Sequence, residues 1–519
     1  MTELEQAMNE PPGSDQDFVA ELMRVAARQP ESPAIIDDHT TIAYGELARS
    51  VTAKADAMSG AGLRPGDRVA LVAENSADYL ATAFAVWRAG GVLATIYPAS
   101  GAEDLAYCLA GSDPALAVAD RRTVAAVRAA APAGLPVTVI DDGFAVQRVR
   151  GSTIPNPGGL RAPPALICYS SGTTSRPKAI MVAASALYNG ALTYAQVWRV
   201  TQADRTIVCL PMAWLYGLAS TSMVTLLAGG TVVALRRAHP ALITDAIARH
   251  RATVLPAVST IFAKLSGHLD GLEEHPDLSS LRFCVSGGEP RNESAFARWT
   301  QFTGCPVHDT FCSSEYFPLI TYDPVADPEP RRGAAGKVVP RAEMKIVDAA
   351  GAEVPTGEVG EALARGPGLM LGYWRDTENT RAVLTEDGWY RTRDLVRMDE
   401  SGYVYVVGRL SDMIIRGGSN VSPAEVERIL REHPAVRDAS VVGLPDATYG
   451  QRVVAAIVAE DPGSFDRDAV AAFCAARLAS YKLPTTFVVV AELPQNPTTG
   501  KVDRRRVATA LQEAGAVPS

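Results

Sequence analysis

The sequence predicts an α/β protein in which a large N-terminal domain of layered α/β subdomains precedes a small α+β C-terminal domain. Its 519 residues are long enough for roughly three to four domain-sized units. Apolar runs alternate with amphipathic helical patterns to about residue 320, and short strands with glycine turns follow to residue 408. We therefore expect a first domain over residues 1–410, ending in a small β-barrel-like subdomain, and a second domain over residues 411–519.

The alternation is clearest near the N-terminus, where helix and strand patterns follow one another twice. Apolar residues recur at helical spacing over 44–58, and a strand pattern follows over 69–73. Ser76 is placed to cap a helix over 77–89, after which residues 92–98 have the pattern of another strand. Apolar strands separated by amphipathic helices are typical of a largely parallel sheet.

The C-terminal segment has the order strand, helix, strand, strand, helix, strand. Ser422 and Glu425 have the spacing of a capping box at the start of a helix. The clearest strand patterns cover 439–444, 452–459 and 486–493. This order over about 105 residues predicts a compact α+β unit.

Composition and charge exclude several classes of function. The formal net charge of −9 argues against a chain held to nucleic-acid phosphates by bulk electrostatics. Seven cysteines without a C-x-x-C pair indicate reduced thiols and a cytoplasmic protein. Cys305, His308 and Cys312 lie close in sequence but lack a fourth soft ligand nearby, so we interpret them as buried or loop positions rather than a zinc site. The acidic first residues are neither a signal nor a transit peptide.

One apolar segment could be mistaken for a membrane span. Residues 206–235 carry no charge, and this uncharged segment is long enough to cross a bilayer. Pro211, Gly217 and the Gly229-Gly230 pair divide the segment, however, so we expect a strand, a loop, a short helix and a strand in a buried core. No membrane partner is expected.

A loop rich in small polar residues follows the buried strand pattern over 165–169. The segment Tyr169-Ser-Ser-Gly-Thr-Thr-Ser-Arg-Pro-Lys178 offers hydroxyl groups, unobstructed backbone N–H groups and a lysine, which together suit a polyphosphate. It is not a Walker loop, because the upstream glycine and the Gly-Lys-Ser/Thr ending are absent. Composition alone leaves open a flexible Ser/Thr surface loop.

The order of several motifs resolves this ambiguity, because the chain resembles the adenylate-forming superfamily over nearly its whole length. That superfamily includes acyl-CoA synthetases, peptide-synthetase adenylation domains and luciferases. Besides the Ser/Thr loop, the matching segments are Leu210-Pro-Met-Ala-Trp-Leu-Tyr-Gly217, Ser286-Gly-Gly-Glu-Pro290, Asp309-Thr-Phe-Cys-Ser-Ser-Glu315, Gly388-Trp-Tyr-Arg-Thr-Arg-Asp394, Gly408-Arg-Leu-Ser-Asp412 with Gly417-Gly418, and Pro497-Thr-Thr-Gly-Lys501.

The resemblance implies an AMP-forming ligase that uses ATP, Mg²⁺ and coenzyme A. A small or aromatic carboxylic acid would attack the α-phosphorus of ATP, giving an acyl-adenylate and pyrophosphate, and the CoA thiol would then displace AMP. Two anions meet in the first step, so a cation is needed over the reacting groups. Lys501 matches the family lysine in that role. The small domain would be mobile, rotating about a hinge at Ser411 to bring Gly417 and Gly418 to a pantetheine tunnel.

Other roles follow from the matching motifs. Glu315 would hold Mg²⁺ through a hard oxygen ligand, and Ser314 would reach the α-phosphate. Asp394 and Arg409 would bind the ribose hydroxyls. Residues assigned to the β- and γ-phosphates are Ser170, Ser171, Gly172, Thr173, Thr174 and Lys178. Residues assigned to adenine are Gly287, Gly288 and Glu289 as one wall, Asp309 at its amino edge and Phe311 against its face.

Several positions depart from the usual pattern of the family. Trp214 replaces a histidine that gates the acyl pocket, and Cys312 replaces a glycine beside the acyl group, which predicts a small, flat or otherwise unusual acid. Phe311 replaces a tyrosine. Arg393 replaces the glycine before Asp394, which is expected to add a cation near the nucleotide. Ser411 replaces the usual hinge residue.

These departures keep a second hypothesis open, in which adenylation is retained but the acceptor is a carrier-protein thiol, an amine or nitrite, as in diazotases. A third hypothesis is a catalytically silent nucleotide-binding protein. It is disfavoured because one chain retains Lys178, Glu315, Asp394, Arg409 and Lys501 together. The sequence leaves the oligomeric state open.

Overall fold

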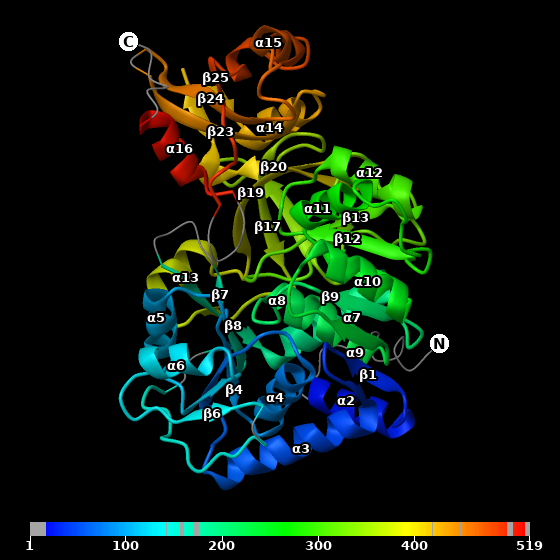
Figure 1. Cartoon of the computed structure of the whole chain (residues 1–519). Coiled ribbons are helices and arrows are strands. Elements are labelled where there is room, and N and C mark those ends of the chain that lie inside the picture. Colours follow the sequence, from blue (N-terminus) through cyan, green and yellow to red (C-terminus); the bar gives the residue numbers. More distant parts are fainter. Residues whose placement is uncertain are drawn as a thin grey trace.

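A computed structural model describes residues 17–141, 143–155, 160–170, 176–417, 419–446, 448–495 and 502–513. Figure 1 shows a large body of two sheets with helices between and outside them, and a smaller unit formed by the C-terminal segment. The sheet of the C-terminal segment shares no strand with the other two.

The larger sheet changes from parallel to antiparallel along its length. Its parallel part is β1-β10-β9-β11-β12-β13, with β2 antiparallel at one edge, and its antiparallel part continues from β13 through β14, β15, β20, β19 and β17 to β16. The bounds are β1 (Pro33–Ile36), β2 (Thr41–Ala43), β9 (Arg205–Val208), β10 (Thr231–Ala234), β11 (Val254–Ala257), β12 (Phe283–Gly287), β13 (Val307–Phe311), β14 (Ile320–Thr321), β15 (Gly336–Val338), β16 (Glu343–Val347), β17 (Gly360–Arg365), β19 (Tyr390–Met398) and β20 (Tyr403–Arg409).

The short strands that were expected over 333–408 as a small β-barrel-like subdomain are β15, β16, β17, β19 and β20. They pair as the antiparallel half of the larger sheet. The reason is the short strand β14, which pairs with β13 on one side and β15 on the other and so joins the two halves.

The second sheet has the order β18-β8-β7-β4-β3-β5-β6, and β7 to β6 are parallel. Its strands are β3 (Arg68–Val72), β4 (Val92–Thr95), β5 (Leu116–Ala119), β6 (Val137–Val139), β7 (Pro164–Ser170), β8 (Lys178–Ala183) and β18 (Gly372–Tyr373). The predicted strands over 69–73, 92–98 and 165–169 correspond to β3, β4 and β7. The predicted cap is also confirmed, since the Ser76 side chain accepts from the Tyr79 N–H at the start of α4.

Alternating side chains bury both faces of each sheet. In the second sheet, Leu71 and Leu93 face the helices between the sheets, whereas Ala70 and Val72 face α5 and α6. Helices between the sheets are α2 (Phe18–Arg28), α3 (Tyr44–Gly60), α4 (Ala77–Arg88) and α7 (Ala184–Val197), followed by the continuous turns α8 (Leu215–Gly217), η1 (Leu218–Met223) and α9 (Val224–Leu227). Outer helices are α5 (Ala102–Ser112), α6 (Val124–Ala130), α10 (Pro240–His250), α11 (Ser259–Asp270), α12 (Glu293–Thr303) and α13 (Thr377–Val383).

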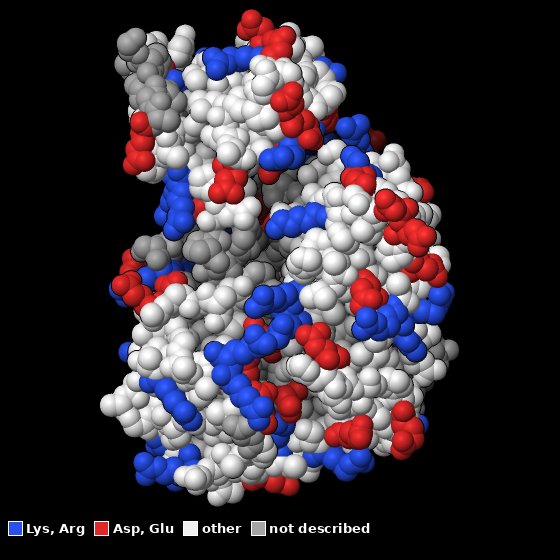
Figure 2. All heavy atoms as spheres, viewed as in Figure 1, with Lys and Arg blue, Asp and Glu red and all other residues white. Residues whose placement is uncertain are grey.

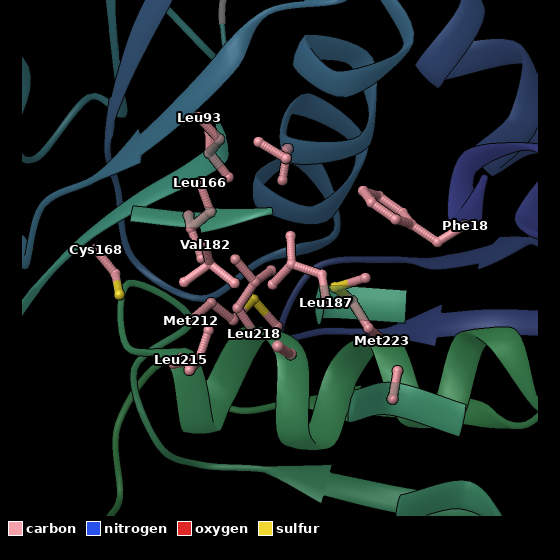
Figure 3. Close-up of a cluster of buried hydrophobic side chains, with 14 of the residues drawn as sticks. Phe18, Leu93, Leu166, Cys168, Val182, Leu187, Met212, Leu215, Leu218 and Met223 are labelled. Atoms are coloured by element: carbon pink, nitrogen blue, oxygen red, sulfur yellow. The ribbon is translucent and has the colours of Figure 1, made fainter. Parts of the chain in front are cut away.

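The uncharged segment 206–235 has the predicted order of strand, loop, helix and strand, namely β9, α8 to α9, and β10. In Figure 3 its helical turns direct Leu215 and Leu218 toward Val182 of the second sheet, and Met223 toward Leu187 of α7. Burial in this core explains why the segment lacks charge. No helix in the described part of the chain is both long and apolar enough for a membrane span.

The C-terminal unit is a third sheet covered by helices on both faces. β22-β21-β24-β23 lie in that order, and β25 pairs with β24. Val441 and Val453 pack under α14 and α15, while Val442 and Val454 pack under α16. The bounds are β21 (Ile414–Arg416), β22 (Ser419–Val421), α14 (Pro423–Arg431), β23 (Val436–Asp446), β24 (Gly450–Ala459), α15 (Arg467–Ala475), β25 (Thr486–Val489) and α16 (Arg504–Glu513), with 3₁₀ turns η2 (Leu410–Asp412) and η3 (Ser480–Lys482).

Only one of the two hydrogen bonds of the predicted capping box forms at the start of α14. The Ser422 hydroxyl accepts from the Glu425 N–H at 3.3 Å. The Glu425 carboxylate instead pairs with Lys482, at 2.7 Å from its Nζ. Lys482, which lies outside α14, therefore pairs with the Glu425 carboxylate. The capping-box pattern had predicted that this carboxylate would bond the backbone at the start of the helix.

Candidate active site

The site forms where the carboxyl ends of parallel strands from both large sheets meet. β4 and β7 end at Thr95 and Ser170 in one sheet, and β9, β12 and β13 end in the other. Asn75, which follows β3, links the two edges by donating from Nδ2 to Leu210 O (2.8 Å) and Leu235 O (3.0 Å) and by accepting from Met212 N (2.7 Å). Ligands of α/β proteins bind at such edges. Figure 2 shows a hollow in the surface beneath the small domain, with Lys and Arg side chains along its borders.

The start of the phosphate loop is held by strand pairing. Ser170 lies opposite Lys178 in the antiparallel β7–β8 pair, so both residues stand at the base of the connecting loop. Ser171, Gly172, Thr173 and Thr174 lie outside the described residues.

A second group brings Glu315 to the same place. The Tyr373 hydroxyl donates to Glu315 Oε1 at 2.9 Å, and Lys178 Nζ lies 5.0 Å from the centre of the Tyr373 ring. Ser314 and Glu315 lie beside the Cys168 thiol of β7, whose pKa is raised to about 12, chiefly by burial. The structure thus gathers Lys178, Ser314 and Glu315 from two separate motifs. Tyr373 was missed, because only the pairing of β18 with β8 brings it here.

Asp394 and Arg409 are brought together by the β19–β20 pair, in which they lie directly opposite. Arg409 Nε donates to Asp394 Oδ1 at 3.2 Å. The Asp394 side chain is buried, whereas that of Arg409 is 55% exposed. Burial raises the pKa of Asp394 to about 6, against the lowering effect of Arg409.

The predicted adenine wall lacks side chains where β12 ends. A Cβ on Gly287 would lie 2.7 Å from Thr310 Cγ2, and Gly288 has a φ of +77°, so glycine is needed at both positions. The carboxylate of Glu289 turns away from this wall, because its Oε2 accepts from the N–H and hydroxyl of Thr260 at the start of α11, both at 2.9 Å. Phe311 is half-buried at the end of β13.

Asp309 lies buried near the end of β13 with a partner that the sequence did not reveal. Arg291 Nη1 donates to Asp309 Oδ2 at 3.3 Å. Burial raises the pKa of Asp309 to about 7, although Arg291 lowers it. One oxygen of the carboxylate predicted at the amino edge of adenine is therefore engaged by an arginine.

Aromatic residues occupy the region predicted for the acyl pocket. The Trp214 and Tyr97 rings have centroids 5.3 Å apart and planes 36° apart. Tyr216 has its pKa raised well above the ordinary value, chiefly by burial and further by the neighbouring Cys312 thiol. Tyr97 and Tyr216 were not singled out from the sequence.

Residues of the hinge and small domain are described in part. The Ser411 hydroxyl donates to Asp412 Oδ1 at 2.9 Å, and Gly417 has a φ of +56°. Arg393 also has a positive φ, +62°, which accounts for glycine being usual there. Its guanidinium donates to Ala382 O of α13 at 3.0 Å, so this cation has a protein partner. Gly418 and Lys501 lie outside the described residues.

The Cys305, His308 and Cys312 cluster has other partners. The Cys305 thiol lies beside Cys284 and donates to Pro306 O at 3.9 Å. His308 Nε2 lies 2.9 Å from Asp327 O. Across the residues that the structure covers, three or more His, Cys, Asp or Glu side chains are nowhere arranged to hold a metal ion.

Fold and site together define an adenylate-forming ligase. The family model described as AMP-binding enzyme matches residues 22–374, and that of the AMP-binding enzyme C-terminal domain matches residues 425–501. The chain therefore belongs to the AMP-binding enzyme family.

Relatives with named activities match almost the whole chain. A feruloyl-CoA synthase of Amycolatopsis is 33% identical over 92% of this chain and 95% of its own. An indoleacetate–CoA ligase of Aromatoleum aromaticum is 32% identical over the same shares. Among solved structures, ATP-bound MatB from Rhodopseudomonas palustris has a TM-score of 0.86 at 29% identity, covering 96% of this chain and 99% of that one. The amide bond synthetase McbA from Marinactinospora thermotolerans has a TM-score of 0.84 at 29% identity, covering 95% and 99%.

Proposed function

We propose that this ligase acts in the cytoplasm on a small or aromatic carboxylic acid, using ATP and Mg²⁺, and transfers the acyl group to the thiol of coenzyme A. The observation that carries the proposal is the proximity of Glu315 to Lys178, through Tyr373, and to the Asp394–Arg409 pair, with which its charge interacts. Relatives that are named CoA ligases of aromatic acids support the choice of acid and acceptor.

The chemistry has two steps. A carboxylate oxygen attacks the α-phosphorus of ATP, and the bond to pyrophosphate breaks. A thiol then attacks the acyl carbonyl, the bond to AMP breaks, and the thiol proton is lost to solvent. Lys501 would stabilise the negative charge that develops in the first step.

The described residues suit the two ends of the nucleotide. Lys178 and Ser170 would bind the outer phosphates together with the Ser/Thr loop. Asp394 would accept hydrogen bonds from the ribose hydroxyls, beside the exposed guanidinium of Arg409.

Glu315 fits a magnesium ion because it offers a hard anionic oxygen, and the Tyr373 hydroxyl fixes its orientation. The bound ion would neutralise phosphate charge.

We also place the domain boundary at residue 410. The separate core of the third sheet supports this division, as does the gap between the two family-model matches. The 3₁₀ turn at Leu410–Asp412 would then contain the hinge, with Ser411 at its centre.

A second candidate acceptor is an amine, and the similarity to an amide bond synthetase favours it. The bulk of Trp214 and Cys312 where smaller side chains are usual in the family also agrees with an unusual acyl or acceptor site. A carrier-protein thiol and nitrite are further acceptors of the same adenylate.

One assay separates these acceptors. The enzyme is incubated with Mg-ATP and a panel of small acids, with CoA, an amine, nitrite, a carrier protein or no acceptor, and pyrophosphate, AMP and CoA are followed. Turnover that needs both acid and CoA supports the proposal. Turnover that ignores CoA but needs another acceptor contradicts CoA as the acceptor, and the absence of pyrophosphate release with every acid contradicts adenylation itself.

The role of the lysine is tested by Lys501→Ala. Loss of a charge-stabilising donor typically costs about 2.7 to 4 kcal/mol, so adenylation should slow by about 10²- to 10³-fold. Transfer from a supplied acyl-adenylate should be nearly unchanged. Arg505→Ala is the matched control, because Arg505 is an exposed cation on the neighbouring helix α16. Equal losses in both half-reactions would contradict the assigned role.

A further inference from the structure

Tyr97 and Trp214 form a bridge between the two sheets at their carboxyl edges. Tyr97 follows β4 of the second sheet, and Trp214 is the N-cap residue of α8, which follows β9 of the larger sheet. Their centroid distance of 5.3 Å lies within the range of favourable aromatic pairs. Both side chains are half-buried, so part of each residue remains accessible.

The backbone that carries Trp214 is fixed independently of this ring contact. Asn75 binds the backbone on both sides of Pro211, and the Tyr79 hydroxyl donates to Met212 O at 3.1 Å. In Figure 3 Met212 and Leu215 lie beside Cys168, at the end of β7. With the main chain held, the direction of the Trp214 ring depends on its side-chain rotamer and on what contacts the ring.

On the side of the larger sheet, Tyr216 lies next to Gly287 and Cys312. Tyr216 Cε1 would lie 3.3 Å from a Cβ at Gly287, and Tyr216 interacts with Cys312. Trp214 lies two residues before Tyr216, and its partner Tyr97 lies two residues after Thr95, which pairs with Cys168 of β7. The Tyr97–Trp214 pair therefore links the strand that ends at Ser170 with the segment that contacts Gly287 and Cys312. In the proposed reaction, the acid reaches the α-phosphate between these two edges.

We infer that Tyr97 is a positioning residue that stacks on Trp214 and holds the indole as the wall limiting the length of the acid. The inference rests on the proposed function. A longer acid would have to displace the indole and lose the ring contact, whereas a short one would not. Burial raises the pKa of Tyr97, so the stacking ring stays uncharged at neutral pH.

The experiment compares benzoate with the longer cinnamate as probes. Pyrophosphate release and hydroxylamine trapping of the acyl-adenylate measure kcat/KM for each acid without requiring a thiol acceptor. Tyr97→Ala should raise the ratio of kcat/KM for cinnamate over benzoate by about 10-fold, the low end of the discrimination typical of one methylene group. Tyr97→Phe retains the ring and should leave the ratio unchanged. The KM for ATP should stay constant in both variants.

The double variant tests whether Tyr97 acts through the indole. Trp214→Ala should raise the ratio at least as much as Tyr97→Ala, and adding Tyr97→Ala to it should produce no further change. An unchanged ratio in a folded Tyr97→Ala protein, or additive effects in the double variant, would overturn the inference. If Tyr97→Ala unfolds, Tyr97→Leu keeps apolar bulk without a ring and must show the same rise in ratio. Failure of the wild-type enzyme to release pyrophosphate with any acid would instead overturn the proposed function.

Discussion

Two carboxylate–arginine pairs border the site, and they differ mainly in the exposure of the arginine. In the Asp309–Arg291 pair, the closest nitrogen and oxygen are 3.3 Å apart and the side chains are 9% and 10% exposed. In the Asp394–Arg409 pair the distance is 3.2 Å and the exposures are 7% and 55%. Arg291 is held further by Glu293, at 3.0 and 3.2 Å, and its guanidinium lies 4.9 Å from the Phe296 ring centre.

The same carboxylate–arginine pairing therefore serves two purposes in this protein. The Arg291 guanidinium is enclosed by protein groups, so it contributes chiefly to the structure of β13 and α12. The Arg409 guanidinium has one face in solvent, so it can contact a ligand while it holds Asp394. Exposure rather than distance distinguishes the two, since the two distances are nearly equal.

The largest expected effect is on stability at the enclosed pair. Arg291→Met removes the buried cation and leaves Asp309 and Glu293 without it, which should lower the free energy of unfolding by about 3 kcal/mol. Arg409→Met is the matched control and should lower it less, by about 1 to 2 kcal/mol, because it leaves one buried carboxylate unpaired but removes a guanidinium that gains little from pairing in water. Denaturant unfolding of both variants at pH 8 measures the difference. Equal losses of unfolding free energy in the two variants would contradict the distinction between the pairs.

The next effect is on nucleotide binding at the exposed pair. Asp394→Asn removes the charged acceptor and should raise the KM for ATP by about 10- to 100-fold, because hydrogen bonds to charged groups contribute about 1.5 to 3 kcal/mol. Asp309→Asn should raise it less, since that carboxylate is already engaged by Arg291. Steady-state kinetics at pH 8 measure the KM for ATP of both variants and show which is larger. Melting temperatures serve as a control for folding.

The pH dependence of the same measurement supports or contradicts the assignment. Burial raises the pKa of Asp394 to about 6, so the carboxylate is charged above this pH and takes up a proton below it. The wild-type KM for ATP should therefore rise as the pH falls from 7 to 5. The Asp394→Asn variant cannot titrate here and should lose this part of the pH profile. A rise of the same size in the variant would show that another group is responsible.

Much of the fold could be predicted because its determinants are local. Helical spacing over 44–58, the cap at Ser76 and the uncharged segment 206–235 all record burial within a few turns of chain. The continuity of the larger sheet could not be predicted, because it depends on the short strand β14, whose partners lie on separate segments. Local patterns identify strands but do not specify which edges will pair.

The same limit applies to the site. Motifs located Glu315, Asp394 and Arg409 because each motif carries its own chemistry. Tyr373, Arg291 and Tyr97 were missed because they belong to no motif that was recognised. They contact Glu315, Asp309 and Trp214, respectively, only in the folded chain. The roles of Lys501 and of Ser171 to Thr174 stay predictions, since these residues lie outside the described part of the chain.

A third carboxylate–arginine pair extends the comparison to the contact between the domains. Arg332 Nη2 lies 3.1 Å from Glu432 Oε1 of α14's C-cap, and the Arg332 side chain is 70% exposed. The pair borders a groove of about 690 Å³ lined in part by α12 and α14. Because exposure increases from Arg291 through Arg409 to Arg332, the energetic contribution of this pair should be the smallest of the three.

Arg332→Ala should therefore change the unfolding free energy by less than about 1 kcal/mol and either half-reaction by no more than about 5-fold. The effect should be lost at high salt, which screens exposed charges. Arg298→Ala is the matched control, because it breaks an exposed pair with Asp270 within the large domain. If Arg332→Ala alters the ratio of adenylation to transfer and Arg298→Ala does not, the contact influences domain orientation despite its small energy. A loss above 10-fold that persists at high salt would show that exposure does not rank these pairs.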